Sequence, residues 1–285
     1  MSRFGSAQDV KGKLEGVRYL ADDHLAVTVY LADRLDKPIL CEGPAGVGKT
    51  ELAKAIAIAT GQRLLRLQCY EGLDEAKALY EWNYKKQLLR IQADSSEHEW
   101  RAVEEDIFAE EFLLSRPLLS AIRAAEPVVL LIDEVDRVEV ETEALLLEVL
   151  SEWQVSIPEL GTIAAQNLPL VVLTSNNTRE LSEALKRRCL FLHMDYPDIQ
   201  REREIILARV PDIDAAFAEQ IAAVVRSVRR FDLKKAPSIS ETLDWARTLL
   251  LLGVDRLDTR ATLDTLSLLL KYQQDIEKVQ RELVV

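Results

Sequence analysis

Hydrophobic residues in the first two-thirds of the chain gather in short runs, separated by longer stretches in which they recur at helical spacing. Apolar runs of this length are typical of strands buried on both faces of a parallel sheet. The runs that predict strands are Pro38–Glu42, Arg63–Cys69, Pro127–Ile132, Leu168–Thr174 and Leu190–His193. Helical spacing is found over residues 13–36, 51–57 and 141–153, with a break or N-cap at Asp22-Asp23. This alternation predicts an α/β fold with a parallel sheet flanked by helices.

Beyond Tyr196 the strand pattern stops, and only helical periodicity remains. The helical stretches are residues 198–210, 213–231, 238–252 and 259–283, separated by Pro211, Pro237 and Gly253. Helices that follow an alternating α/β region predict a second, smaller, all-helical domain. We therefore expect an α/β domain over residues 1–195 and an all-helical domain over residues 196–285.

Two segments do not fit the regular alternation. The first, residues 70–116, predicts an insertion, and the second begins at Trp153. In the second, Trp153, Val155 and Ile157 alternate with polar residues before a turn at Pro158–Gly161, which predicts a hairpin.

The first segment contains the aromatic residues Tyr80, Trp82 and Tyr84. Such a cluster suits either a contact with a partner or ordinary core packing.

Composition narrows the class of protein. The chain has 285 residues, of which 48% are hydrophobic and 29% charged, and a net charge of −12. The acidic balance disfavours nucleic acid as a partner, because nucleic-acid binding relies on Lys and Arg. Cys41, Cys69 and Cys189 lie far apart in apolar runs, which predicts reduced core cysteines and a cytoplasmic protein. No apolar stretch approaches the roughly 20 residues that span a bilayer.

The first chemical motif is a phosphate-binding loop between a predicted strand and a predicted helix. It has the pattern G-x-x-x-x-G-K-[ST] and consists of Gly43, Pro44, Ala45, Gly46, Val47, Gly48, Lys49 and Thr50. The glycines let the backbone approach a phosphate, and the loop N–H groups and the helix N-terminus favour the negative charge. The pattern predicts that Lys49 reaches the β- and γ-phosphates and that Thr50 ligates Mg²⁺, so ATP and Mg²⁺ are the expected cofactors.

The second motif lies at the carboxyl ends of later strands, where ligands bind in open α/β sheets. Asp133 and Glu134 end one buried strand, and Asn176 ends another. Asp133 suits contact with Mg²⁺ through water, and Glu134 suits polarisation of the water that attacks the γ-phosphate. Asn176 has both a donor and an acceptor with which to orient that water or contact the γ-phosphate, although alone it would be an ordinary turn residue.

A basic pair, Arg187-Arg188, follows the Asn176 strand. Such a pair is usually a solvated surface. In an oligomeric ATPase it is also where an arginine finger would reach the nucleotide of a neighbouring subunit.

Together these stretches resemble the AAA+ ATPases and, among them, the MoxR family, with the CoxD-type subgroup that is accessory to molybdenum-containing carbon monoxide dehydrogenases as the nearest match. The resemblance runs along nearly the whole chain. It rests on CEGPAGVGKTELAKA, RLLRLQCYEGLDEAKALYEWNYKKQLLRIQ, EEFLLSRPLL, LLIDEVDR, ALLLEVLSEWQVSIPELGTI, VVLTSNNTRELSEALKRRCLF and SETLDWARTL. The first and fourth stretches mark any P-loop ATPase, whereas the second, fifth and last are more specific to the subgroup.

The resemblance implies an α/β ATPase domain followed by a helical lid domain, with two hairpin insertions near residues 73–114 and 153–165. It implies a ring, expected to be a hexamer, that uses ATP hydrolysis as a chaperone for another protein. It implies a partner with a von Willebrand factor A domain and a client metalloenzyme, such as a molybdenum hydroxylase. Arg188 falls on the arginine of the family pattern D-R-F, so it is the first choice for the finger and Arg187 is the second. The implied location is the cytoplasm, with peripheral attachment to the inner face of the membrane left open.

The sequence departs from the wider family at the start of one lid helix, where relatives often have an arginine that contacts the γ-phosphate. The corresponding segment, Pro237–Glu241, has no arginine, and Ser238 and Glu241 predict a capping box instead. Lys234, Lys235 and Arg247 stay open as substitutes.

Two other functions explain part of the pattern. A DNA-acting AAA+ motor or loader would share the motifs but is disfavoured by the acidic charge. A P-loop kinase for a small molecule would explain the phosphate loop, but not the insertions, the arginine pair or the helical lid.

Overall fold

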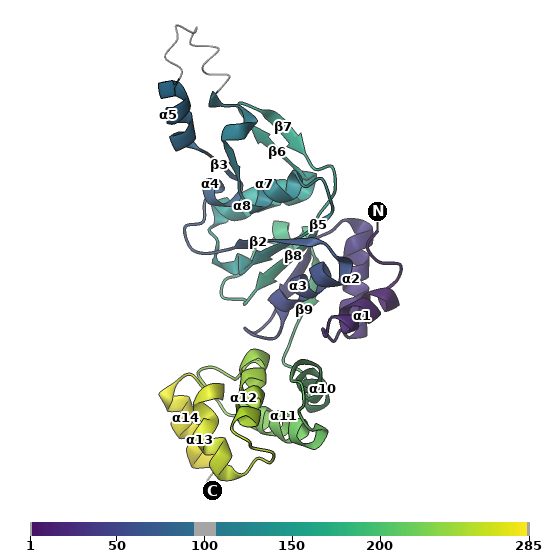
Figure 1. The fold of residues 1–285 in the computed structure, drawn as a ribbon, viewed down its shortest axis with the longest axis vertical. Helices are drawn as coiled ribbons and strands as arrows, with labels where there is room; N and C mark the ends of the chain where they lie inside the picture. Colours follow the sequence, from purple (N-terminus) through teal and green to yellow (C-terminus); the bar gives the residue numbers. More distant parts are fainter. Residues whose placement is uncertain (1, 94–106, 284–285) are drawn as a thin grey trace.

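The computed structural model describes residues 2–93 and 107–283 (Figure 1). Its centre is a five-stranded sheet in the order β2-β5-β8-β1-β9, and every neighbouring pair is parallel. The strands are β1 (Ile39–Glu42), β2 (Arg63–Gln68), β5 (Val128–Asp133), β8 (Leu170–Ser175) and β9 (Leu190–His193). The predicted parallel sheet flanked by helices is confirmed, and the carboxyl ends of all five strands lie at one edge.

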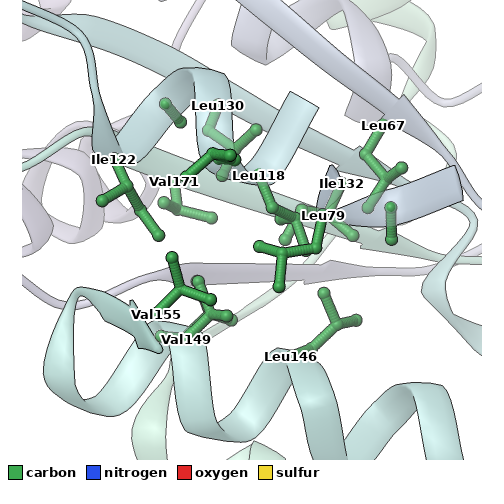
Figure 2. Close-up of a cluster of buried hydrophobic side chains, with 14 of the residues drawn as sticks. Leu67, Leu79, Leu118, Ile122, Leu130, Ile132, Leu146, Val149, Val155 and Val171 are labelled. Atoms are coloured by element: carbon green, nitrogen blue, oxygen red, sulfur yellow. The ribbon is translucent and has the colours of Figure 1, made fainter. Parts of the chain in front are cut away.

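Both faces of the sheet are buried, and β5 shows how one strand serves two cores. Leu130 and Ile132 pack into one cluster of buried side chains, whereas Val129 and Leu131 pack into the other. Such alternation requires apolar residues at every position, which explains the continuous run in the sequence. Figure 2 shows the first cluster, in which the strand residues meet side chains such as Leu118 and Leu146.

Helices α1 (Ala7–Gly16), α2 (Asp23–Leu35) and α3 (Lys49–Thr60) contribute to the second cluster. The predicted break at Asp22-Asp23 is the start of α2, where the Asp22 carboxylate accepts a hydrogen bond from the Leu25 N–H. Gly61 ends α3 in the left-handed conformation, which glycine adopts without strain.

The opposite face is covered by α7 (Pro117–Ile122), α8 (Val140–Glu152) and α9 (Glu183–Arg188). A short 3₁₀ turn, η2 (Val135–Arg137), lies between β5 and α8. After α8 the chain forms a hairpin of β6 (Gln154–Ile157) and β7 (Gly161–Ala164), paired antiparallel within the expected insertion at 153–165.

The other insertion is more elaborate than the simple hairpin expected within residues 73–114. Two short strands, β3 (Tyr80–Trp82) and β4 (Leu113–Ser115), pair antiparallel, but α5 (Tyr84–Ala93) and the turn η1 (Glu110–Phe112) lie between them. A helix, α4 (Glu75–Ala78), precedes them, and residues 94–106 lie outside the described residues.

The aromatic cluster of this insertion divides between core and surface. Trp82 is buried and packs edge-on against Phe108 at 5.2 Å between ring centroids. Tyr80 contacts Trp82 and packs against the same core. Tyr84, by contrast, is 63% exposed on α5.

The C-terminal helices follow β9 along a single connection and pack around their own buried cluster, which contains Trp245 (Figure 1). They are α10 (Ile199–Arg209), α11 (Ala215–Arg229), α12 (Ile239–Leu251), α13 (Thr259–Leu269) and α14 (Gln273–Leu283). The buried carboxylate of Glu202 links three of them. Glu202 lies on α10, forms an ion pair with Arg229 on α11 and accepts a hydrogen bond from Thr242 on α12. None of the described helices is both long and apolar enough to cross a membrane.

The expectation of one continuous helix over residues 259–283 is wrong, because the chain turns between α13 and α14. Leu270 has extended backbone angles, and α14 begins at Gln273. The turn lets the buried Asp275 carboxylate accept hydrogen bonds from the backbone N–H groups of Lys234 and Lys235. These groups belong to the connection before α12 and would otherwise need another acceptor.

Candidate functional site

The phosphate loop connects β1 to α3, and two of its glycines are required by close approaches. Gly43 has φ +154°, and a Cβ there would lie 1.9 Å from the Met194 carbonyl oxygen. Gly46 has φ +76°, and a Cβ there would lie 2.3 Å from Cβ of Ser238, the N-cap of α12. The loop is therefore enclosed between the connection after β9 and the start of α12.

Lys49 is buried and holds the loop in its curved form. Its Nζ donates hydrogen bonds of 2.6 Å to the carbonyls of Gly43 and Pro44 and of 2.9 Å to Asn176 Oδ1. Burial lowers the pKa of Lys49, and the negative charges of nearby groups, among them Asp133 and Asp136, oppose this shift. The ammonium group thus lies between the loop and the end of β8.

Asp133 ends β5 beside the first turn of α3. Its Oδ1 accepts hydrogen bonds from the Thr50 hydroxyl at 2.9 Å and from the Thr174 hydroxyl at 2.6 Å. Its Oδ2 lies 2.5 Å from a guanidinium nitrogen of Arg66 on β2. A hydroxyl and a carboxylate are oxygen donors that suit Mg²⁺, which takes its remaining ligands from phosphate and water. The donor set around Thr50 and Asp133 therefore fits the ion.

Glu134 follows Asp133 in the left-handed conformation, with φ +58°. A non-glycine residue in this conformation is uncommon and is held here by a hydrogen bond from the Glu134 N–H to the Thr174 hydroxyl. Its carboxylate Oε2 accepts a hydrogen bond of 3.2 Å from Gln68 Nε2 and lies 3.0 Å from Nε of Arg137. The Glu134 carboxylate thus lies at the edge of the sheet where the carboxyl ends of the strands meet, and its Oε2 contacts Gln68 and Arg137.

Asn176 is positioned by Asp136, a buried carboxylate on η2. Asp136 Oδ2 accepts hydrogen bonds from the backbone N–H groups of Asn176 and Thr178 and from the Thr178 hydroxyl. Burial alone would raise the pKa of Asp136, but these hydrogen bonds lower it below its usual value. The loop after β8 is therefore fixed to the segment that follows Glu134.

Arg187 and Arg188 both lie on α9 and are exposed, and neither lines the cavity beside Lys49. The Arg187 side chain is 81% exposed and lies 3.9 Å from Glu183. Arg188 donates hydrogen bonds to the Ser151 hydroxyl and to the Ala184 carbonyl. The structure thus brings together the predicted loop, Asp133, Glu134 and Asn176, but leaves the two arginines on the surface.

Two adjoining cavities flank the loop. The smaller, of about 260 Å³, is lined by the loop, by Asp133, Glu134 and Asn176, and by Ser240 of α12. The larger, of about 960 Å³, lies between the sheet region and the C-terminal helices and is lined by residues such as Tyr19, Met194 and Leu243. The first has the size and polarity for phosphates, and the second is large enough for a nucleoside.

Of the three open lid candidates, only Arg247 lines the larger cavity. Lys235 forms an ion pair with Glu241, and Lys234 lies over the Tyr272 ring at 4.2 Å. The predicted capping box is present, since Ser238 and Glu241 each accept a hydrogen bond from the backbone N–H of the other.

Several residues of the site were not found from the sequence. Arg66 and Gln68 lie on β2 and reach the carboxylates because β2 pairs with β5. Thr174 lies inside a buried apolar run, where a hydroxyl gives no separate signal.

The match to known families agrees with this geometry. Residues 38–189, more than half of the chain, match the AAA domain of the dynein-related subfamily. The chain belongs to this AAA family. The protein is accordingly an AAA+ ATPase, and its cofactors are ATP and Mg²⁺.

Proteins of similar sequence include an uncharacterized protein of Staphylococcus haemolyticus, which is 26% identical over 243 residues, 81% of this chain and 85% of that protein. The gas vesicle ATPase GvpN of Haloferax mediterranei is 25% identical over 202 residues, 68% of this chain and 56% of that protein.

Solved structures of the AAA+ fold are also similar. Two single-substitution variants of RuvB from Thermotoga maritima are each 21% identical. One matches with a TM-score of 0.52, over 93% of this chain and 72% of that chain. The other has a TM-score of 0.51, over 92% and 72%. At this identity the similarity shows the fold alone.

Proposed function

We propose that this AAA+ ATPase is a MoxR-type chaperone that assembles into a ring and remodels a partner metalloenzyme. The observation that carries the ring is the distribution of cations around the phosphate cavity. Among the described residues that line it, the cations are Lys49 and Lys54, and no arginine is present. Since Arg187 and Arg188 are exposed on α9, a neighbouring subunit is the natural source of the missing arginine.

Within one subunit we assign each side chain a separate task. Lys49 and the loop N–H groups bind the β- and γ-phosphates. Glu134 accepts a proton from the attacking water, and Asn176 orients that water against the γ-phosphate. Thr50 and Asp133 would hold Mg²⁺, which neutralises phosphate charge when bound.

The C-terminal helices supply a way to use the energy of hydrolysis. We propose residues 196–285 as a lid domain that moves against the α/β domain of residues 1–195. The start of α12 contacts the phosphate loop, and Arg209 on α10 pairs with Glu51 on α3 at 3.2 Å. These contacts cross the nucleotide cavity, so a change in bound phosphate alters the surroundings of the lid.

The proposed client and partner rest on the MoxR and CoxD-type resemblance of the sequence. On that basis the proposed client is a metalloenzyme such as a molybdenum hydroxylase, and the proposed partner is a von Willebrand factor A domain protein. The ring is proposed as a hexamer in the cytoplasm, where it can attach peripherally to the membrane. The net charge of −12 argues against the DNA-acting alternative.

The finger is tested by mixing two inactive variants. Arg188→Ala subunits keep Glu134 but present no finger, whereas Glu134→Gln subunits present a finger but lack the base. Mixed rings should regain part of the wild-type phosphate release, since an intact site then faces an intact finger. Arg187→Ala, mixed in the same way, tests the second choice. Absence of rescue in both mixtures would contradict action in trans.

The client is tested by trapping. Glu134→Gln bound to ATP should retain its substrate, and Lys49→Ala provides the matched control that does not bind nucleotide. We expect a metalloenzyme and a von Willebrand factor A domain protein to be enriched on the trap only. Salt-sensitive binding of duplex DNA near physiological ionic strength, without such enrichment, would instead favour the DNA-acting motor.

A further inference from the structure

Arg66 has a place in the site that the assigned roles do not explain. It lies on β2, an edge strand, and its guanidinium contacts Asp133 Oδ2 at 2.5 Å. The same nitrogen contacts Oε1 of Gln68, two residues further along the strand. Because Gln68 Nε2 donates to Glu134 Oε2, a continuous chain of polar contacts joins Asp133 to Glu134 through Arg66 and Gln68.

The two oxygens of Asp133 are used differently. Oδ1 accepts hydrogen bonds from the hydroxyls of Thr50 and Thr174, which fix the carboxylate against α3 and β8. Oδ2 contacts Arg66. A cation that binds at Asp133 therefore meets a carboxylate that already has a positively charged partner at Oδ2.

We propose that Arg66 is a positioning residue that competes with Mg²⁺ for the negative charge of the Asp133 carboxylate. The inference rests on the proposed placement of Mg²⁺ at Thr50 and Asp133. Two positive groups at one carboxylate repel each other, so the ion binds at Asp133 most favourably when the guanidinium moves aside.

The surroundings of Arg66 make this exchange inexpensive. Its side chain is 50% exposed, although that of Asp133 is only 4% exposed, so the displaced guanidinium regains water while the ion replaces it at the buried carboxylate. Gln68 remains as a second contact that keeps the displaced group on β2. The movement also changes what surrounds Gln68, and thereby links metal binding to the contact that Gln68 makes with Glu134.

The test is a magnesium titration of nucleotide binding, which needs no turnover. A fluorescent, non-hydrolysable ATP analogue is bound to the full chain, and the Mg²⁺ concentration at half-maximal gain in affinity is measured. Arg66→Gln and Arg66→Met should each need about two- to fivefold less Mg²⁺ than wild type, which is the weight of a partly exposed ion pair. Using both variants keeps the test open if one of them fails to fold.

Arg63→Gln is the matched control, because Arg63 is exposed at the other end of β2 and its loss removes the same charge. It should leave the Mg²⁺ requirement unchanged. An unchanged or higher requirement in the Arg66 variants, or an equal fall in Arg63→Gln, would overturn the competition. Asp133→Asn separates the two proposals: if it does not raise the Mg²⁺ requirement, the placement of the ion is wrong, whatever Arg66 does.

Discussion

The backbone N–H of Ile239 donates a hydrogen bond of 3.2 Å to the carbonyl of Gly46. This bond joins the phosphate loop to the first turn of α12, although the two residues are far apart in the sequence. Ser238, the N-cap of the helix, lies where a Gly46 side chain would be. The loop thus packs against the C-terminal helices, and the conformation of one constrains the other.

Gly46→Ala should weaken nucleotide binding by about tenfold or more, because the added Cβ forces the loop and α12 apart and such overpacking costs about 1–3 kcal/mol. Calorimetric titration with an ATP analogue measures the effect. Gly61→Ala is the matched control, since Gly61 also has positive φ (+66°) but nothing lies near its Cβ position. That variant should lose about 1–2 kcal/mol of stability and keep its nucleotide affinity. Equal affinities in both variants would show that the contact with Ser238 is unimportant.

Glu134→Gln should bind ATP with nearly wild-type affinity but release phosphate at about one hundredth of the wild-type rate or lower. The reason is that the amide cannot accept the proton of the attacking water. A coupled phosphate assay and an equilibrium binding assay together separate turnover from binding. Glu139→Gln removes the same charge from an exposed neighbouring position and should be close to wild type in both. Near-normal phosphate release by Glu134→Gln would exclude Glu134 as the base.

Glu202→Gln should destabilise the C-terminal helices by about 3–5 kcal/mol, since it leaves the Arg229 guanidinium buried without its counter-charge. Chemical denaturation followed by circular dichroism detects the change. Asp264→Asn breaks the exposed Arg260–Asp264 contact of 3.7 Å on α13 and should cost less than about 0.5 kcal/mol. A loss below about 1 kcal/mol in Glu202→Gln would mean that the helices relax around the uncompensated charge.

Acid should destabilise the protein partly through Asp136. Its pKa in the folded protein is below the usual 3.8, so the native carboxylate stays ionised while the unfolded chain takes up a proton. The free energy of unfolding therefore falls as the pH drops below about 4. Above that value the ionised Asp136 makes its full contribution to the stability of the folded protein. In Asp136→Asn this part of the decline should be absent, whereas Asp255→Asn, at an exposed position between α12 and α13, serves as the control. Parallel pH profiles in wild type and Asp136→Asn would contradict the assignment.

The sequence allowed the sheet and the centre of the site to be predicted because both depend on local patterns. The continuous run before Asp133 required burial on both faces, and burial on both faces required a parallel strand with helices on each side. The loop could be found because its glycines and Lys49 have fixed spacing. Asn176 followed from the rule that strand ends share one edge of such a sheet.

What could not be predicted depends on contacts between distant segments. Arg66 and Gln68 act at the site because β2 is the neighbour of β5, and strand order is not written in any local pattern. The turn between α13 and α14 allows Asp275 to accept a hydrogen bond from the backbone N–H of Lys234. Helices α12 and α13 separate these two residues in the sequence. Helical periodicity continues across this turn, so pattern alone favoured one helix.

The close approach of Gly43 to Met194 has a mechanical consequence. β1 and β9 are neighbours in the sheet, and the Met194 N–H donates to the Glu42 carbonyl at 2.8 Å, so the phosphate loop and the connection to the C-terminal helices leave the sheet side by side. The C-terminal helices therefore meet the loop at two points, at Met194 through the connection and at Ser238 through α12. A line through these two contacts defines an axis, and rotation of the C-terminal helices about that line disturbs the contacts least. A residue change at either contact should therefore shift the axis.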